Sequence, residues 1–372
     1  MNITDYVSKY AHLSFDENPF NEADSLIMAQ MAYLNWDIIL PNEGSSNKAS
    51  ILFKNVSDDI NVSLNANEFD SKRSEKLFML MKRSKRYQDT KARFVIRIDD
   101  VEKHIQFFAV TFTLPNGLHV ISFRGTDLTL NGWMEDTMLA FKDAIPSHAE
   151  AVDYVDKVTG IIRGPFIIVG HSKGGNLSYY SAMMMKPSHR RRLISAYSFD
   201  GPGFFSEKIY ETKEYKQAKK KLIKYIPFDS VVGILLNHEN NAQIISSSAI
   251  AFFQHDMFSW VIYNDYKFVR KKKRLITSHV NEKALVHFVN DLTLEEREEI
   301  CTSAFALVGS PDQSLSYLVK HLPKTTAHFI KTFISYSKEQ KKELKFVIFK
   351  IMGAYKKSIK YYLFNKKTRA IE

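Results

Sequence analysis

The sequence has 372 residues, of which 45% are hydrophobic and 13% aromatic, so the chain can form one large core or a core with a smaller satellite. This composition excludes disorder over most of the chain. Cys301 is the only cysteine, which excludes a disulfide within the chain and argues against a cysteine-ligated metal site.

The net charge of +11 is unevenly distributed. Residues 303–372 contain 14 Lys and Arg but only 4 Asp and Glu, so this segment carries +10 and residues 1–302 carry +1. The basic character therefore belongs to the C-terminal fifth and says little about the rest. We expect no nucleic-acid partner, because the short basic run Arg270–Arg274 is typical of a solvated loop.

The first quarter of the chain is predicted to be mainly helical. Residues 1–40 favour helices that end near Pro41, residues 42–47 are typical of a loop, and residues 73–88 predict a further helix. The first thirty residues are acidic and lack the basic start and apolar core of a signal peptide. No segment approaches the ~18 consecutive apolar residues of a membrane-spanning helix. We therefore expect a cytoplasmic protein.

The pattern changes at His104. The segment His104–Leu114 is rich in Phe, Val, Ile and Thr, the next three residues are Pro-Asn-Gly, and Leu118–Phe123 (LHVISF) continues as a second strand-like run. Two such runs joined by a short turn predict a β-hairpin.

Beyond the hairpin, segments typical of buried strands alternate with segments typical of helices. The predicted strands are Pro165–Val169, Leu193–Phe199, Leu222–Phe228 and Ala242–Ser247, and the predicted helices are residues 147–159, 175–186 and 206–221. This alternation predicts an α/β fold with a mostly parallel sheet flanked by helices. Everything after residue 275 favours helix. We therefore expect an N-terminal helical cover (residues 1–90), an α/β core (residues 91–275) and a helical C-terminal region (residues 276–372).

Residues 338–364 predict a basic amphipathic helix. Apolar side chains recur at helical spacing from Leu344 to Leu363, and the lysines of the segment fall largely elsewhere. Such a helix can pack on the core with its lysines in solvent, or it can lie on an anionic membrane surface. Peripheral membrane contact is therefore one of two expectations for this tail.

One sequence motif is typical of a catalytic serine. Gly170–Gly175 (GHSKGG) follows a buried-strand run and precedes a helix-compatible stretch, which is the context of a G-x-S-x-G nucleophile elbow. A sharp strand-to-helix turn would hold Ser172 in a strained backbone conformation with its hydroxyl above the sheet. Gly170 and Gly174 would remove side chains that collide across this turn. The motif indicates a serine nucleophile, against the alternative of a glycine-rich turn with a structural serine.

A serine nucleophile needs a base and an orienting acid, which in this arrangement follow it along the chain in the order acid, then histidine. Asp229 follows the strand Leu222–Phe228, and His255 lies just past the next predicted strand. We therefore predict Ser172, Asp229 and His255 as the catalytic residues. Asp200, which ends the strand Leu193–Phe199, is the alternative acid, although an aspartate before Gly-Pro-Gly is also typical of a turn.

Other histidines are weaker candidates for the base. His238, His279 and His287 are the rivals, and the last two fall in the predicted helical region. His171 precedes the nucleophile, but its direction on the elbow points it away from the hydroxyl. We expect it to be a packing residue.

These residues together resemble those of class 3 lipases. The resemblance rests on Phe123–Asp127 (FRGTD), on GHSKGG, on Ser198–Gly203, and on Asp229 and His255. Over roughly residues 1–308 the chain more closely resembles a bacterial family of uncharacterised lipase-3-like α/β hydrolases. Two further segments carry that second resemblance, the amino-terminal NPFNEAD at residues 18–24 and QHDMFSW at residues 254–260.

The resemblance implies an α/β-hydrolase fold and an oxyanion hole. Thr126 would supply a hydroxyl and a backbone N–H, and Lys173 would supply its backbone N–H. The sequence departs from many lipases in having lysine after the nucleophile, and we expect the Lys173 side chain to face outward, where it could favour an anionic substrate. For Arg124 we expect a salt bridge that holds the loop.

The expected function is that of a serine hydrolase that cleaves a lipid or other acyl ester through a Ser-His-Asp triad and an acyl-enzyme. The alternative is a catalytically silent module of the same fold that binds a partner or a membrane surface. An acyltransferase or a peptidase would use the same residues. No cofactor or metal is expected, because the sequence has no H-E-x-x-H spacing, P-loop or dinucleotide fingerprint.

Overall fold

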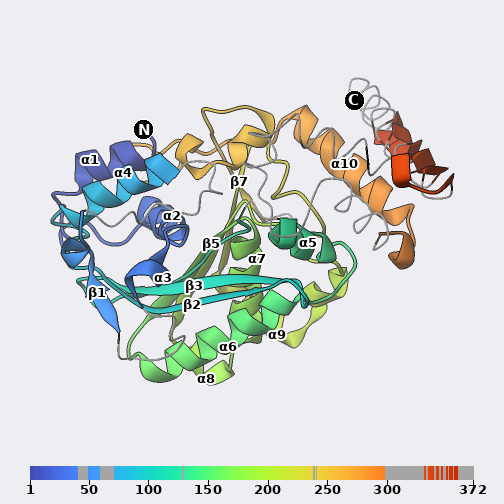
Figure 1. Cartoon of the computed structure of the whole chain (residues 1–372). Coiled ribbons are helices and arrows are strands. Elements are labelled where there is room, and N and C mark those ends of the chain that lie inside the picture. The colour runs from blue at the N-terminus through green and yellow to red at the C-terminus, as the bar shows by residue number, and fades with distance from the viewer. Residues whose placement is uncertain are drawn as a thin grey trace.

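The computed structural model describes residues 1–40, 49–58, 71–127, 130–237, 239, 241–297 and scattered positions between 331 and 358. An eight-stranded sheet lies at its centre, with helices on both faces (Figure 1). The strands are β1 (Ser50–Leu52), β2 (Lys91–Asp100), β3 (Ile105–Thr113), β4 (His119–Phe123), β5 (Phe166–His171), β6 (Leu193–Phe199), β7 (Leu222–Pro227) and β8 (Gln243–Ile245).

The strands lie side by side in the order in which they occur along the chain. The pairings from β1 to β4 are antiparallel and those from β4 to β8 are parallel. The predicted α/β class, the hairpin of β3 and β4, and the four later strands are therefore confirmed, with small shifts at their ends. Sequence reasoning missed β2, whose alternation is interrupted by a bulge between Arg93 and Ile96 and masked by its charged residues.

Ten α-helices are found in the described residues. They are α1 (Ile3–Tyr10), α2 (Glu22–Met31), α3 (Trp36–Ile39), α4 (Ser71–Lys82), α5 (Leu130–Met138), α6 (Pro146–Ile161), α7 (Lys173–Met184), α8 (Pro187–Arg190), α9 (Lys213–Ala218) and α10 (Ile276–Asn290). The predicted single helix over residues 206–221 is wrong. In its place α9 lies between two short 3₁₀ turns, Glu207–Glu211 and Lys219–Lys221.

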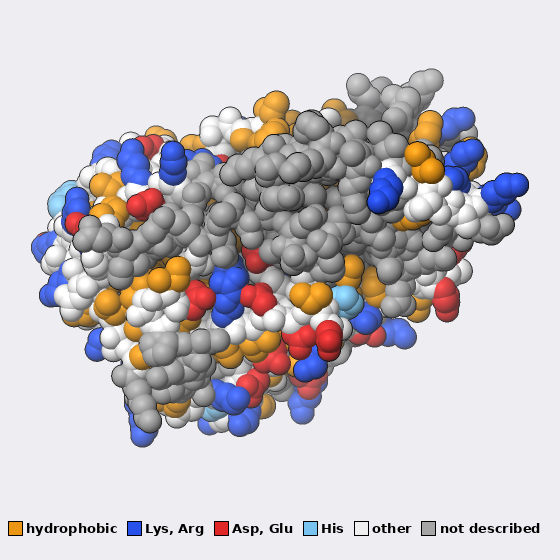
Figure 2. Space-filling model, in the orientation of Figure 1, with side chains coloured by type: hydrophobic (Ala, Val, Ile, Leu, Met, Phe, Trp, Pro, Cys, Tyr) orange, Lys and Arg blue, Asp and Glu red, His pale blue; other side chains and the backbone are white. Residues whose placement is uncertain are grey.

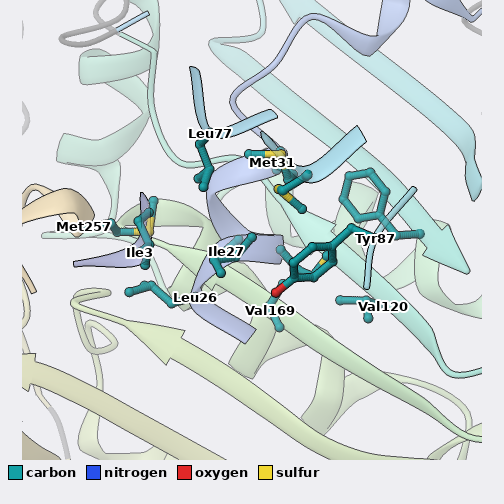
Figure 3. Packing of buried hydrophobic residues seen from close by; sticks show 14 of the residues in the cluster. Ile3, Leu26, Ile27, Met31, Leu77, Tyr87, Val120, Val169 and Met257 are labelled. Atoms are coloured by element: carbon teal, nitrogen blue, oxygen red, sulfur yellow. The ribbon is translucent and has the colours of Figure 1, made fainter. Parts of the chain in front are cut away.

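The two faces of the sheet bury two separate hydrophobic clusters. Successive residues of a strand point to opposite faces, so Val120 packs in the cluster that contains α1, α2 and α4, while Ile121 packs in the cluster that contains α6, α7 and α9. Figure 3 shows the first cluster, in which Leu26 and Ile27 of α2 lie between Leu77 of α4 and the sheet. The N-terminal helices thus share a core with the sheet.

A buried ion pair anchors these N-terminal helices. Asp24 and Arg86 are both fully buried, and the guanidinium binds both carboxylate oxygens, with Nε to Oδ1 at 2.9 Å and Nη2 to Oδ2 at 2.5 Å. Asp24 also accepts a hydrogen bond from the backbone N–H of Asn21 at 3.0 Å, which makes it part of the capping box of α2. Arg86 Nη1 donates to the carbonyl of Asn18 at 2.8 Å. The segment NPFNEAD therefore has a structural explanation in this contact.

The C-terminal part is described only in pieces. Helix α10 agrees with the predicted helical character after residue 275. The predicted basic helix of residues 338–364 lies largely outside the described residues. Within the described part of the chain, none of the helices has the length and apolar character to cross a membrane. On the face shown in Figure 2, the described Lys and Arg side chains are interspersed with Asp and Glu.

Replacing Arg86 should destabilise the protein strongly. Arg86→Met leaves the Asp24 carboxylate buried without its cation, which we expect to lower the free energy of unfolding by about 3–5 kcal/mol. Urea unfolding followed by circular dichroism measures this loss. Lys85→Met is the matched control, because Lys85 pairs with Glu17 on the surface at 2.9 Å and the change there should be much smaller. Equal losses in the two variants would contradict the role given to the buried pair.

Candidate active site

The predicted site residues lie in the loops that follow the carboxyl ends of neighbouring strands. Thr126 follows β4, Ser172 follows β5, Asp200 follows β6, Asp229 follows β7 and His255 lies in the segment after β8. Because β4 to β8 are parallel, these ends meet at one edge of the sheet, where open α/β sheets bind their ligands.

Ser172 occupies the turn between β5 and α7. Its backbone has a φ of 58° and a ψ of −130°, a conformation that side-chain-bearing residues rarely adopt and that indicates local strain. Ser172 is also the N-cap of α7, so the first N–H groups of that helix surround it. The strand-turn-helix context predicted for GHSKGG is thus present.

The glycines of the motif are required by close packing. A Cβ on Gly170 would lie 2.0 Å from the carbonyl oxygen of Gly174, and a Cβ on Gly174 would lie 2.4 Å from the carbonyl oxygen of Phe123. Since both obstacles are backbone atoms, they cannot rotate away. Only glycine lets α7 begin this close to β4 and β5.

The carboxylate that contacts His255 is that of Asp200. His255 Nδ1 lies 2.7 Å from Asp200 Oδ2. An ionised carboxylate can only accept, so Nδ1 carries the proton and Nε2 is the ring nitrogen with the lone pair. Sequence reasoning offered Asp200 only as the alternative acid.

Asp200 is fully buried, and its second oxygen has two further donors. The hydroxyl of Ser230 donates to Oδ1 at 2.5 Å, and the backbone N–H of Gly233 donates to the same oxygen at 3.1 Å. The backbone of Asp200 has a φ of 49°, and its N–H donates to the carbonyl of Tyr225 on β7 at 2.8 Å. These contacts hold a buried charge that would otherwise be costly.

The choice of Asp229 as the acid is corrected by this geometry. Its Oδ1 accepts a hydrogen bond from the hydroxyl of Thr277 on α10 at 2.5 Å, and its backbone N–H donates to Oε1 of Gln254 at 2.9 Å. Asp229 therefore holds the segment that carries His255 instead of contacting the imidazole ring. The loop after β7 contacts Asp200 through hydrogen bonds from Ser230 and Gly233.

The residues of QHDMFSW hold the loop of His255 in place. Trp260 is fully buried, and its indole N–H donates to the carbonyl of Gln254 at 2.8 Å. Asp256 forms an ion pair with Arg73 of α4 at 2.7 Å. The Asp256 contact thus fixes the loop to α4 directly after His255, and the Trp260 contact holds the loop closed across His255.

His171 links the N-terminal helices to the same loop. Its Nε2 lies 2.8 Å from the carbonyl oxygen of His255, so Nε2 donates, and Nδ1 then accepts from the hydroxyl of Tyr33 at 2.9 Å. Burial lowers the pKa of His171 well below its ordinary value, which keeps the ring neutral in this arrangement. Sequence reasoning expected a packing residue and missed these two hydrogen bonds.

Tyr33 also reaches the segment of the predicted oxyanion hole. A Cβ on Gly125 would lie 2.3 Å from the hydroxyl of Tyr33 and 3.0 Å from Cβ of Ser172. Gly125 is therefore needed where the N-terminal helices, the elbow and the loop after β4 meet.

Thr126 has its hydroxyl committed to a neighbour. Thr126 Oγ1 donates a hydrogen bond to Oδ2 of Asp136 on α5. Burial raises the pKa of Asp136 to about 6. When Asp136 is ionised, the hydroxyl of Thr126 donates to its carboxylate. The candidate donor to an oxyanion is then the backbone N–H of Thr126.

The expectation that the Lys173 side chain faces outward is wrong. The side chain is 1% exposed, and Nζ donates to Oε2 of Glu135 at 2.7 Å and to the carbonyl and side-chain oxygens of Gln106 at 2.8 and 3.0 Å. Glu135, itself fully buried, also accepts from the hydroxyl of Ser147 at 2.6 Å. The lysine thus ties the start of α7 to β3 and α5 and cannot attract an anionic substrate. Its backbone N–H, in the first turn of α7, has no partner within the helix.

Arg124 is 2% exposed and stacks over the ring of Phe108 at 4.5 Å, and among the described residues it does not form the predicted salt bridge. Of the rival bases, His279 lies on α10 beside Arg274 and Glu282, and His238 lies outside the described residues. In the part of the chain that the structure describes, no group of three or more His, Cys, Asp or Glu residues could hold a metal ion.

His148 of α6 contacts α7, the helix that begins at the elbow. The backbone N–H of Ile145 donates to its Nδ1 at 3.1 Å, so Nε2 carries the proton and donates to Oδ1 of Asn176 on α7 at 2.6 Å. Asn176 in turn donates to the carbonyl of Gly203 at 2.8 Å. The loop that follows Asp200 is thereby fixed to the helix that follows Ser172.

The profile of one family, Mbeg1-like, matches residues 81–306, which is more than half of the chain. The chain belongs to the Mbeg1-like family. A search of curated proteins found no match. The region matched by the Mbeg1-like profile includes Ser172, Asp200 and His255, whereas Tyr33 and the first helices precede it.

His148 should make the stability of this Mbeg1-like protein depend on pH. Burial lowers the pKa of His148 from 6.5 to about 4, so between these values the unfolded chain binds a proton that the folded protein does not. Stability from this group is present above pH 6.5 and is lost as the pH falls to 4, by about 3 kcal/mol.

Urea unfolding at several pH values tests this dependence. His148→Gln should reduce the loss of stability between pH 6.5 and pH 4 by about 3 kcal/mol, whatever its stability at neutral pH. His12→Gln, at an exposed position, should leave the loss unchanged. A His148 variant with the same pH dependence as the unaltered protein would show that His148 does not cause it.

Proposed function

We propose that this protein is a serine hydrolase of the α/β-hydrolase type that cleaves acyl esters through Ser172, His255 and Asp200. The observation that carries the proposal is the 2.7 Å contact between His255 Nδ1 and Asp200 at the same sheet edge as the strained turn of Ser172. We assign the catalytic unit to residues 91–275, with the N-terminal helices as a cover.

In the proposed mechanism His255 is the general base. Asp200 accepts the hydrogen bond from Nδ1–H, which orients the ring with the lone pair of Nε2 toward Ser172. As Oγ of Ser172 attacks the carbonyl carbon of the ester, its proton passes to Nε2. The resulting imidazolium is stabilised by Asp200 and returns this proton to the leaving alcohol when the C–O bond breaks. A water molecule then attacks the acyl-enzyme, giving its proton to Nε2, which returns it to Oγ.

The oxyanion of the tetrahedral intermediate would be bound by backbone groups. The N–H of Lys173 at the start of α7 is one donor, and the N–H of Thr126 is the other. The ion pair of Lys173 with Glu135 and the hydrogen bond of Thr126 to Asp136 would hold both donors in place before the substrate arrives. Each such donor can contribute about 3 kcal/mol to stabilisation of the transition state.

The proposed substrate is a small-molecule or lipid ester. Support comes from the lipase-like character of the Mbeg1-like family and from the chain order of Ser172, Asp200 and His255, which is the serine, acid, histidine order of this hydrolase type. The exposed apolar residues Ile250 and Phe253, which precede His255 in the same loop, also favour an apolar acyl group beside the base.

Ser172 should react covalently with a fluorophosphonate probe. We expect labelling of the folded protein at Ser172, because a serine that an adjacent imidazole activates attacks the phosphorus of the probe, expels fluoride and becomes phosphonylated. Ser172→Ala should abolish labelling, and Ser188→Ala, at an exposed serine of α8, should leave it unchanged. Mass spectrometry of the labelled peptide identifies the site. Absence of labelling in well-folded protein would favour a silent module of the same fold.

The identity of the acid can be tested with a pair of isosteric variants. Asp200→Asn should lower the rate of ester hydrolysis by about 10³–10⁴-fold, because the amide no longer holds His255 in the reactive tautomer. Asp229→Asn should lower it less than about tenfold, because Asp229 acts on the loop through its backbone N–H. Initial rates on a panel of p-nitrophenyl esters measure both effects. The opposite ranking would return the role of the acid to Asp229.

A further inference from the structure

A buried lysine lies behind the carboxylate that contacts His255. Lys224 of β7 is 5% exposed and is the direct neighbour of Ser198 on β6, two residues before Asp200. Lys224 and Ser198 line a small cavity together with tyrosines of α7, of the 3₁₀ turn Glu207–Glu211 and of α9. An ammonium group at this depth is costly, and the hydrogen bond that the structure gives it goes to a backbone carbonyl.

Three hydrogen bonds connect this lysine to the imidazole. Lys224 Nζ donates to the carbonyl of Gly233 at 2.9 Å, and the N–H of Gly233 donates to Oδ1 of Asp200 at 3.1 Å. The other oxygen of Asp200 accepts from His255 at 2.7 Å. A Cβ on Gly233 would lie 2.3 Å from Oδ1 of Asp200, so this residue is held against the carboxylate. A change at Lys224 is therefore transmitted to Asp200 through one residue.

The positive charge of Lys224 also acts on Asp200, because the two charges attract each other. Burial lowers the pKa of Lys224 to about 8, and the negative charge of Asp200 opposes this lowering. The ammonium is thus mostly charged at neutral pH, and its attraction to Asp200 is mutual.

Other charged and titratable groups also face Lys224. Arg274 disfavours its charged form and Glu282 of α10 favours it. The cavity adds Glu239, which is paired with Lys219, and three tyrosines, Tyr179, Tyr210 and Tyr215. Asp200 is the first of the charges that raise the pKa of Lys224, so the coupling between these two groups is the one that a substitution should reveal.

We propose that Lys224 is a positioning residue for the acid of the triad, holding the Gly233 peptide against Asp200 and supplying a positive charge that favours the ionised carboxylate beside His255. This inference rests on the proposed function, because it gives Asp200 and His255 their catalytic roles. Lys224 itself does not touch the substrate.

The test measures the rate of fluorophosphonate labelling of Ser172 between pH 5 and pH 9. Lys224→Met removes the hydrogen bond and the charge with little change in volume. We expect the rate at pH 7 to fall by about tenfold to a hundredfold, because the acid and the imidazole lose their fixed orientation. We also expect the acid limb of the pH profile to move up by about 0.5–1 pH unit, since loss of a cation favours protonation of both groups.

Lys221→Met is the matched control. Lys221 precedes β7 and donates to the carbonyls of Arg190 and Leu193 at 2.7 and 2.5 Å, at the opposite end of the strands from Asp200. Its loss should lower stability but leave the acid limb in place and the labelling rate within about twofold. Lys224→Arg keeps a charged donor beside the cavity and should restore the acid limb to that of the unaltered protein.

Each outcome decides between the two proposals. If the unaltered protein labels at Ser172 and Lys224→Met behaves like Lys221→Met, the inference about Lys224 is wrong and the proposed function stands. If the unaltered protein is not labelled, the proposed function fails and the inference fails with it. Thermal unfolding establishes that each variant is folded, and Lys224→Gln replaces Lys224→Met should the latter not fold.

Discussion

The site depends on the need to satisfy one buried carboxylate. Asp200 has no access to water, so its charge is tolerated only where protein donors surround both oxygens. Ser230, Gly233 and His255 supply these donors from loops that follow β7 and β8. The same contacts that make the charge tolerable bring the imidazole to the edge of the sheet. The burial of Asp200 and the position of His255 therefore depend on the same hydrogen bonds. The loops around Asp200 cannot vary independently for this reason.

The sequence was sufficient to predict the parts of the site that depend on local pattern. The elbow follows from three glycines around Ser172 between an apolar run and a helix-compatible stretch, and the structure has this turn. The hairpin and the later strands follow from composition and spacing. His255 was found because it is the histidine that follows the last strand of the alternation.

Which aspartate contacts His255 could not be predicted in the same way. Asp200 and Asp229 both follow a strand, and their spacing from Ser172 fits the expected order equally well. What separates them is the path of the chain after β8, which brings His255 back over the end of β6 and places the backbone of Asp229 against Gln254. The inward direction of Lys173 was missed for a related reason. Its partner Glu135 lies far from it in sequence, and no local pattern indicates that these two residues meet.

The N-terminal helices are held by residues from the far end of the described α/β region. Glu22 of α2 accepts a hydrogen bond from the backbone N–H of Phe268 at 3.0 Å and pairs with Arg270 at 2.5 Å. Because the strands lie in chain order, the sheet can grow one strand at a time as the polypeptide leaves the ribosome. Helix α2 can contact Arg86 early in synthesis, but it gains its contacts with Phe268 and Arg270 only once residue 270 has been synthesised. The loop of His255 is completed at the same stage, so the contact between His255 and Asp200 forms later in synthesis than the turn of Ser172.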